Sequence, residues 1–190
     1  MSKRERVFAV LPTLMTLGNA LCGFAAITYA AKLGPDDVQP DGPDLLLAAM
    51  CIFAGMVFDA LDGRVARWAK QTSEFGAQLD SLCDAVTFGV APAFLMRQFA
   101  ATSVFPARIL WPIAALYAVC AILRLARFNV ETEEDDSHDG FSGLPSPAAA
   151  GVVASFPIAV YGIKKLIDPT NESISKFALE AGLWLDQAVD

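Results

Sequence analysis

Five long apolar stretches, separated by short polar segments, constrain this chain more than any other feature of its sequence. They cover residues 8–31, 45–61, 79–100, 109–128 and 147–163. A helix needs about 20 residues to cross the hydrocarbon core of a bilayer, and each stretch has about the length to cross or nearly cross it. The sequence therefore predicts an all-α fold, a polytopic transmembrane bundle with five clear membrane helices.

The composition supports this interpretation. Hydrophobic residues make up 55% of the 190 residues, which is more than one soluble core of this size usually takes up. The charged residues, 18% of the chain, cluster between the apolar stretches and do not alternate with them as on an amphipathic soluble helix. The net charge of -7 argues against nucleic acid as a partner, because binding to a phosphate backbone needs a basic surface.

The two ends of the chain differ in character. Basic residues precede the first stretch as in a signal peptide, but the apolar run is too long for one, so we interpret it as a retained first helix. We expect one transmembrane domain over residues 1–168. A polar or amphipathic tail follows over residues 169–190, and it either lies at the membrane interface or is a truncated continuation. The four cysteines lie in apolar segments without metal-binding spacing, so we interpret them as small buried hydrophobes.

Lysine and arginine predict the orientation, because they are enriched in cytoplasmic loops. With the amino terminus in the cytoplasm, eight of them lie inside and five outside. The inside set is Lys3, Arg4, Arg6, Arg64, Arg67, Lys70, Arg124 and Arg127, and the outside set is Lys32, Arg97, Arg108, Lys164 and Lys165. We therefore expect a multi-pass protein of the cell (inner) membrane in which the connection between the second and third helices faces the cytoplasm.

Four aspartates flank that connection. Asp59 and Asp62 are spaced i, i+3 at the end of the second stretch, and Asp80 and Asp84 are spaced i, i+4 at the start of the third. On helices, each pair projects from one face. Because a short connection folds the two helices into a hairpin, the four carboxylates can converge in one pocket near the membrane boundary.

A carboxylate cluster in a membrane needs a compensating positive charge, because each charged residue costs roughly 2.5–3.5 kcal/mol on insertion scales. Hard oxygen ligands suit Mg²⁺ or Mn²⁺, particularly beside a phosphate substrate, and Ca²⁺ is a further candidate occupant. The alternative is that the aspartates are helix caps and interfacial charges paired with Arg64 and Arg67. That alternative explains one aspartate more easily than four in register.

The segment from Asp59 to Asp84 reads DxxDGxxARx8Gx3Dx3D and resembles the signature of the CDP-alcohol phosphotransferases. All eight fixed positions are present: Asp59, Asp62, Gly63, Ala66, Arg67, Gly76, Asp80 and Asp84. The resemblance implies two divalent ions that bridge the pyrophosphate of a CDP-linked lipid. It assigns Asp59, Asp62 and Asp80 as metal ligands, and Asp84 as the general base and a further metal contact.

The same resemblance implies that Gly63, Ala66, Arg67 and Gly76 contact the CDP-lipid. The glycines would let the nucleotide approach the backbone, although tight helix packing explains them too. Arg67 is either a phosphate clamp or an anchor that sets the topology. Asn19 in the first stretch is a candidate for the nucleotide or the metal shell, or it satisfies local backbone groups.

Other parts of the chain are similar to the membrane-type phosphatidylserine synthases of this family. They are LPTLMTLGNALCG in the first stretch, RLARFNV at the end of the fourth, and GFSGLPSPAAAG before and within the fifth. This resemblance implies CDP-diacylglycerol and L-serine as substrates, membrane lipid as surroundings, and a homodimer. Arg124 and Arg127 are candidates for the serine carboxylate or a phosphate, or they snorkel to the interface. Asn129 is a candidate for orienting the substrate.

Other functions remain open at this point. A sister enzyme would use glycerol phosphate or inositol phosphate as acceptor, or an archaeal-type lipid donor. A phosphorylated acceptor should demand more basic residues than are supplied by the acidic loop ETEEDDSHD at residues 131–139, which follows the fourth stretch. An ion-coupled carrier is a rival of another class, but it would place its aspartates near the membrane midplane. Members of the resembled family usually have six or more membrane helices, whereas this sequence has five convincing ones.

Overall fold

The computed structural model of the chain describes residues 3–32, 43–69, 74–101, 106–134 and 143–167. Side chains are described within these ranges except at residues 3–11, 66–69, 74, 107, 131–134 and 167. Every described element is a helix. The elements are α1 (Lys3–Ala31), α2 (Pro43–Ala69), α3 (Glu74–Asp84), the π-helix η1 (Ala85–Val90), α4 (Ala91–Ala101), α5 (Ala107–Glu134) and α6 (Ser146–Ile167).

Five segments of these helices are long and apolar enough to cross a membrane, which confirms the predicted number. They are Pro12–Ala31, Pro43–Val65, Phe75–Ala101, Arg108–Val130 and Ser146–Leu166. The third contains α3, η1 and α4 in succession. The predicted boundaries agree with these to within about one helical turn. The chain is thus a multi-pass membrane protein.

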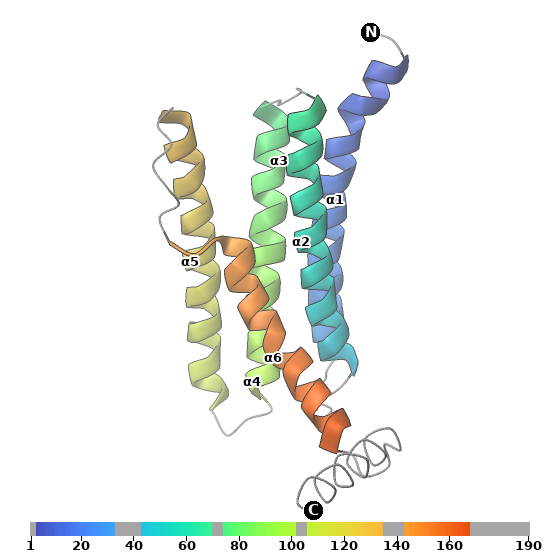
Figure 1. The fold of residues 1–190 in the computed structure, drawn as a ribbon. Helices are drawn as coiled ribbons and strands as arrows, with labels where there is room; N and C mark the ends of the chain where they lie inside the picture. The colour runs from blue at the N-terminus through green and yellow to red at the C-terminus, as the bar shows by residue number, and fades with distance from the viewer. Residues whose placement is uncertain (1–2, 33–42, 70–73, 102–105, 135–142, 168–190) are drawn as a thin grey trace, which may run out of the picture.

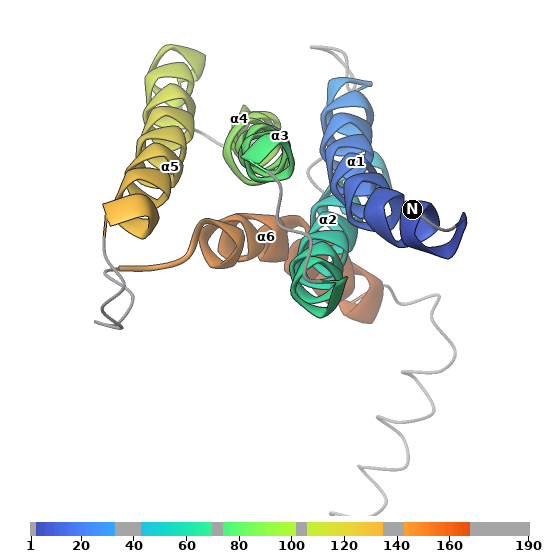
Figure 2. The same cartoon turned by 90° about the horizontal axis from the view of Figure 1, so that it is seen from above.

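The helices form a bundle in which successive membrane-spanning segments run in opposite directions (Figure 1). Viewed from above, α1 and α2 lie at one side, α5 lies at the other, and α3 and α4 lie between them (Figure 2). Helix α6 crosses one face of this row and packs mainly on α2 and α4. The ends of α2 and α5 and the start of α3 meet at the same end of the bundle.

Small side chains make up most of the buried core, which lets the helices approach closely. Five large residues among the fully buried ones are Leu45, Ile52, Phe88, Leu95 and Asn19. Many large apolar side chains point outward instead, and α5 is the extreme case, with only 6% of its span buried. Outward apolar faces of this kind suit a lipid environment, as the composition predicted.

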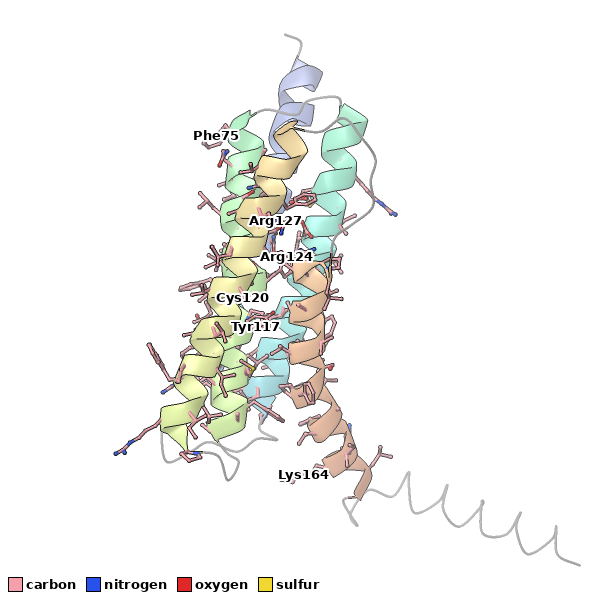
Figure 3. All side chains as sticks on the ribbon, turned by 90° about the vertical axis from the view of Figure 1, so that its left-hand side faces the viewer. Phe75, Tyr117, Cys120, Arg124, Arg127 and Lys164 are labelled. Carbon is pink, nitrogen blue, oxygen red and sulfur yellow. The ribbon has the colours of Figure 1, made fainter. Side chains whose placement is uncertain are left out.

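The cysteines agree only in part with their predicted burial. All four are free thiols, and Cys83 is buried, whereas Cys22 and Cys51 are partly exposed. Cys120 is exposed, so the expectation of burial is wrong there. It lies on α5 (Figure 3), and the physical reason is that, among the described helices, α5 has neighbours on one side only.

The π-helix η1 is the one element that the apolar pattern did not predict. Its residues Thr87, Phe88 and Gly89 are buried, and the Tyr117 hydroxyl on α5 donates a hydrogen bond to the Phe88 carbonyl at 3.3 Å. Short π segments interrupt an α-helix at a local cost and occur frequently at functional sites. This one begins directly after Asp84.

Candidate active site

Three of the four predicted aspartates come together in the structure. Asp59 and Asp62 on α2 and Asp80 on α3 each offer a carboxylate oxygen, and these three oxygens lie within 4.8 Å of one another. Asp62 is buried, with 5% of its surface exposed, and the other two are partly buried. The predicted convergence of the two helical pairs is therefore observed for these three residues.

The space that these carboxylates occupy exists because α2 and α3 do not pack tightly on each other. Helix α1 packs against both, whereas α2 and α3 share few close backbone contacts. Side chains from the two helices can therefore meet between them without a clash of backbones. Helix α1 acts as the common support of the site.

The donor set fits a divalent cation. Asp62 Oδ2 and Asp80 Oδ1 are buried oxygens with no hydrogen-bond partner, and a buried carboxylate oxygen without a partner is costly. Arg64, whose side chain is described, is exposed, and it donates no hydrogen bond to these two buried oxygens. Pairing with Arg64 therefore does not explain the cluster, whereas a cation bound by oxygen ligands would satisfy these atoms.

Asp84 lies beside the three-carboxylate group and is not one of its members. It lies one helical turn beyond Asp80, at the last residue of α3. Its Oδ1 accepts a hydrogen bond of 2.7 Å from Asn19 Nδ2 on α1. The structure thus divides the four aspartates into a set of three and a single carboxylate with an amide partner.

Asn19 is fully buried, and its predicted contact with the nucleotide or the metal shell stays a prediction. Its side chain contacts a carboxylate of the motif rather than only local backbone. The backbone carbonyl oxygen of Asn19 accepts a hydrogen bond of 3.0 Å from the Thr87 hydroxyl. Thr87 is also fully buried, so two polar residues from α1 and η1 are joined inside the bundle.

Two polar residues near the aspartates, Thr16 and Thr87, were not predicted from the sequence as members of the site. Thr16 lies one turn before Asn19 on α1, and its hydroxyl donates to the Pro12 carbonyl at 3.1 Å and lies within hydrogen-bonding reach of Asp62. The signal was present as polar residues spaced i, i+3 within an apolar stretch, which place two polar groups on one face. No local signal marks Thr87, because its partner is 68 residues away.

The glycines of the motif differ in how much the structure says about them. A Cβ added to Gly63 would meet nothing within 4 Å, so close helix packing does not require glycine there. Gly76 is partly exposed. The side chains of Ala66 and Arg67 lie outside the described residues, and their predicted contacts with a CDP-lipid stay predictions.

The candidate acceptor residues lie on α5. Arg124 Nη1 donates to Ser146 Oγ at 3.2 Å, at the first residue of α6, and Arg127 lies one turn further along α5 (Figure 3). Asn129 Nδ2 donates to Ser81 Oγ at 2.7 Å, and Ser81 directly follows Asp80. The part of α5 that carries these polar residues is therefore tied to both α3 and α6.

The comparisons with known proteins identify the family. The family model for CDP-alcohol phosphatidyltransferase matches residues 9–184. The chain belongs to the CDP-alcohol phosphatidyltransferase family. The matched residues include all five membrane-spanning segments, with the three-carboxylate group and Asp84, and leave out only the first turns of α1.

Three curated relatives all carry the name CDP-diacylglycerol–serine O-phosphatidyltransferase. The chain is 41% identical over 145 residues to the one from Mycobacterium tuberculosis, which covers 74% of this chain and 46% of the relative. It is 35% identical over 144 residues to the one from Helicobacter pylori (76% and 55%). It is 35% identical over 139 residues to the one from Bacillus subtilis (73% and 70%).

The chain spans about half the length of the first two relatives. No solved structure matches it.

Proposed function

We propose that this protein transfers the phosphatidyl group of CDP-diacylglycerol to the hydroxyl of L-serine, giving phosphatidylserine and CMP. The observation that carries the proposal is the division of the motif into three clustered carboxylates and one separate carboxylate held by Asn19. A transferase of this kind needs both parts. The clustered carboxylates would bind the cations that contact the diphosphate, and the separate carboxylate would act as the base for the alcohol. The names of the curated relatives support serine as the acceptor.

The residues present suit one or two divalent cations, and Mg²⁺ or Mn²⁺ fits carboxylate oxygens beside a phosphate. Asp59, Asp62 and Asp80 would hold them. A divalent ion bound there would neutralise negative charge on the pyrophosphate and on the departing CMP. The orphaned oxygens of Asp62 and Asp80 support this assignment.

Asp84 is proposed as the general base. Its carboxylate takes the proton of the serine hydroxyl while the serine oxygen forms a bond to the phosphorus that carries the diacylglycerol. The bond from that phosphorus to the oxygen bridging to CMP breaks, and CMP leaves with this oxygen and its electron pair. The acyl chains stay in the membrane throughout, which suits a site built from the ends of membrane-spanning helices.

Arg124 and Arg127 are proposed to receive the carboxylate of serine or a phosphate oxygen. Guanidinium groups bind planar carboxylates through paired hydrogen bonds. The first turn of α6 beside Arg124 adds the positive end of a helix dipole. Asn129, through Ser81, would fix the distance between α5 and the aspartates rather than touch the substrate itself.

The wider setting belongs to the same proposal. The excess of basic residues at the end of the bundle that carries the motif supports a cytoplasmic site in the cell (inner) membrane. A homodimer is expected by analogy with the family. Family membership also speaks against an ion-coupled carrier, and it leaves the acceptor as the main point to test.

The decisive experiment measures CMP release by the purified protein with CDP-diacylglycerol and Mn²⁺ or Mg²⁺. Each candidate acceptor is added separately: L-serine, glycerol phosphate and inositol phosphate. We expect release with serine only, and its loss in Asp84→Asn. Release only with glycerol phosphate would move the protein to a sister reaction, and no release with any acceptor from folded protein would overturn the proposal.

A further inference from the structure

Asn19 occupies an unusual position for a polar residue of a membrane helix. It is fully buried in the middle of the α1 span, where an amide is expensive unless it is hydrogen-bonded. Its Nδ2 donates to Asp84 Oδ1 at 2.7 Å, across 65 positions of the chain. This is a short hydrogen bond for a nitrogen donor, within the range for donors that meet a charged acceptor.

The surroundings of Asn19 leave its side chain little freedom. A Cβ added to Gly55 on α2 would stand 3.0 Å from Asn19 Oδ1 and 2.6 Å from Thr87 Cγ2, so the amide is packed against the bare backbone of a glycine. The Thr87 hydroxyl donates to the backbone carbonyl oxygen of Asn19 at 3.0 Å, which restrains the α1 backbone at this residue. Two helices and the π-helix therefore enclose this residue.

The hydrogen bond has a consequence for the carboxylate it meets. Asp84 is a short side chain that can rotate toward the other three aspartates, one turn away. With Oδ1 engaged by an amide N–H, the other oxygen is left to meet the substrate. A carboxylate that is already oriented loses less freedom on reaching the transition state, and a displacement of about 1 Å can cost on the order of 10²-fold in rate.

We propose that Asn19 is a positioning residue that holds the Asp84 carboxylate in the orientation for proton abstraction, and is not a contact for the CDP-lipid. This inference rests on the proposed function, in which Asp84 is the base. Asn19 acts through Asp84 and touches no reacting atom. Thr87 and Gly55 pack around Asn19 and restrict its movement. The π-helix η1, which contains Thr87, therefore also helps to orient Asp84.

The test uses Asn19→Leu, which keeps a branched side chain of similar volume and removes the donor. We expect kcat for CMP release to fall by on the order of 10²-fold. The KM values for CDP-diacylglycerol and serine, and the metal concentration for half-maximal activity, should stay within about twofold. A rise in the KM for CDP-diacylglycerol with unchanged kcat would overturn the proposal, because it would make Asn19 a nucleotide contact.

The matched control is Gln98→Leu. Gln98 is another buried amide of the bundle, on α4, and its Nε2 donates to the Ala30 carbonyl at 3.1 Å, away from the aspartates. Its replacement should lower thermal stability as much as Asn19→Leu does and leave kcat unchanged. Equal losses of kcat in Asn19→Leu and Gln98→Leu would mean that general destabilisation causes the loss. That result would contradict the proposal that Asn19 positions Asp84.

A double-mutant cycle separates this inference from the proposed function. In an Asp84→Ala background, which removes the acceptor, Asn19→Leu should lower the residual rate no further, and the two losses of thermal stability should be less than additive. Fully additive losses of stability would overturn the inference. If the wild-type protein releases no CMP with any acceptor, the proposed function fails, and the stability cycle alone decides whether Asn19 orients Asp84.

Discussion

Gly23 on α1 lies so close to Thr87 in η1 that a Cβ added to Gly23 would stand 2.9 Å from the Thr87 Cα and 2.5 Å from its Oγ1. Contacts below 3.0 Å with backbone atoms force a displacement, since the backbone cannot rotate away as a flexible side chain can. The same threonine donates to Asn19, whose amide meets Asp84. A change in packing at Gly23 would therefore reach Asp84, the proposed base, through Thr87 and Asn19.

Gly23→Ala should destabilise the protein by about 1–3 kcal/mol, the usual cost of forcing extra atoms into a packed core. It should also lower CMP release, because α1 and η1 must move apart where Thr87 holds Asn19. Thermal unfolding in detergent and the activity assay measure the two effects. Gly162→Ala on α6 is the matched control, because a Cβ there meets nothing within 4 Å, and a loss as large as that of Gly23→Ala would contradict this account.

Substitution of the clustered aspartates should act on metal binding. We expect Asp80→Asn to raise the metal concentration needed for half-maximal activity by at least about 10- to 100-fold, the loss typical of even outer-shell partners of a metal. Asp84→Asn should instead lower the maximal rate strongly, and the metal dependence of its residual rate should change much less, since Asp84 lies outside the three-carboxylate group. The measurement is the Mn²⁺ dependence of CMP release. Identical metal dependence for both variants would contradict the division of roles.

Metal removal should lower the stability of the folded protein as well as its activity. A cation that binds only the native state adds about 2.7 kcal/mol to the free energy of unfolding at a concentration 100 times its Kd. We therefore expect EDTA to lower the melting temperature and Mn²⁺ or Mg²⁺ to restore it. In Asp80→Asn, most of this metal-dependent rise should disappear. If metal raises the melting temperature of wild type and Asp80→Asn equally, the stabilising cation binds at another site.

Arg124→Gln should weaken the use of serine more than the binding of CDP-diacylglycerol. A hydrogen bond to a charged group contributes about 1.5–3 kcal/mol, so kcat/KM for serine should fall by roughly 10- to 100-fold. Arg108→Gln, at the other end of the same helix, serves as the control and should leave kcat/KM unchanged. If Arg124→Gln raises the KM for CDP-diacylglycerol and leaves that for serine unchanged, Arg124 binds a phosphate and not the acceptor.

Several features of the site could be predicted because they are local. The i, i+3 spacing of Asp59 and Asp62 and the i, i+4 spacing of Asp80 and Asp84 fix which side chains share a helical face. The short connection between the two helices then brings both pairs to one end of the bundle. Thr87 could not be predicted in the same way, because neither its spacing nor its neighbours in the sequence distinguish it from other polar residues of apolar helices.

By itself, the sequence determined the five membrane-spanning helices and the faces on which the aspartates lie, since both follow from hydrophobic length and helical periodicity within one segment. Only the tertiary structure decided that Asn19 meets Asp84, that Thr87 meets Gly23, and that three carboxylates gather while the fourth lies beside them. These contacts join helices that are far apart along the chain. They depend on how closely α1 approaches α2, α3 and η1, which the side chains of all these helices set together.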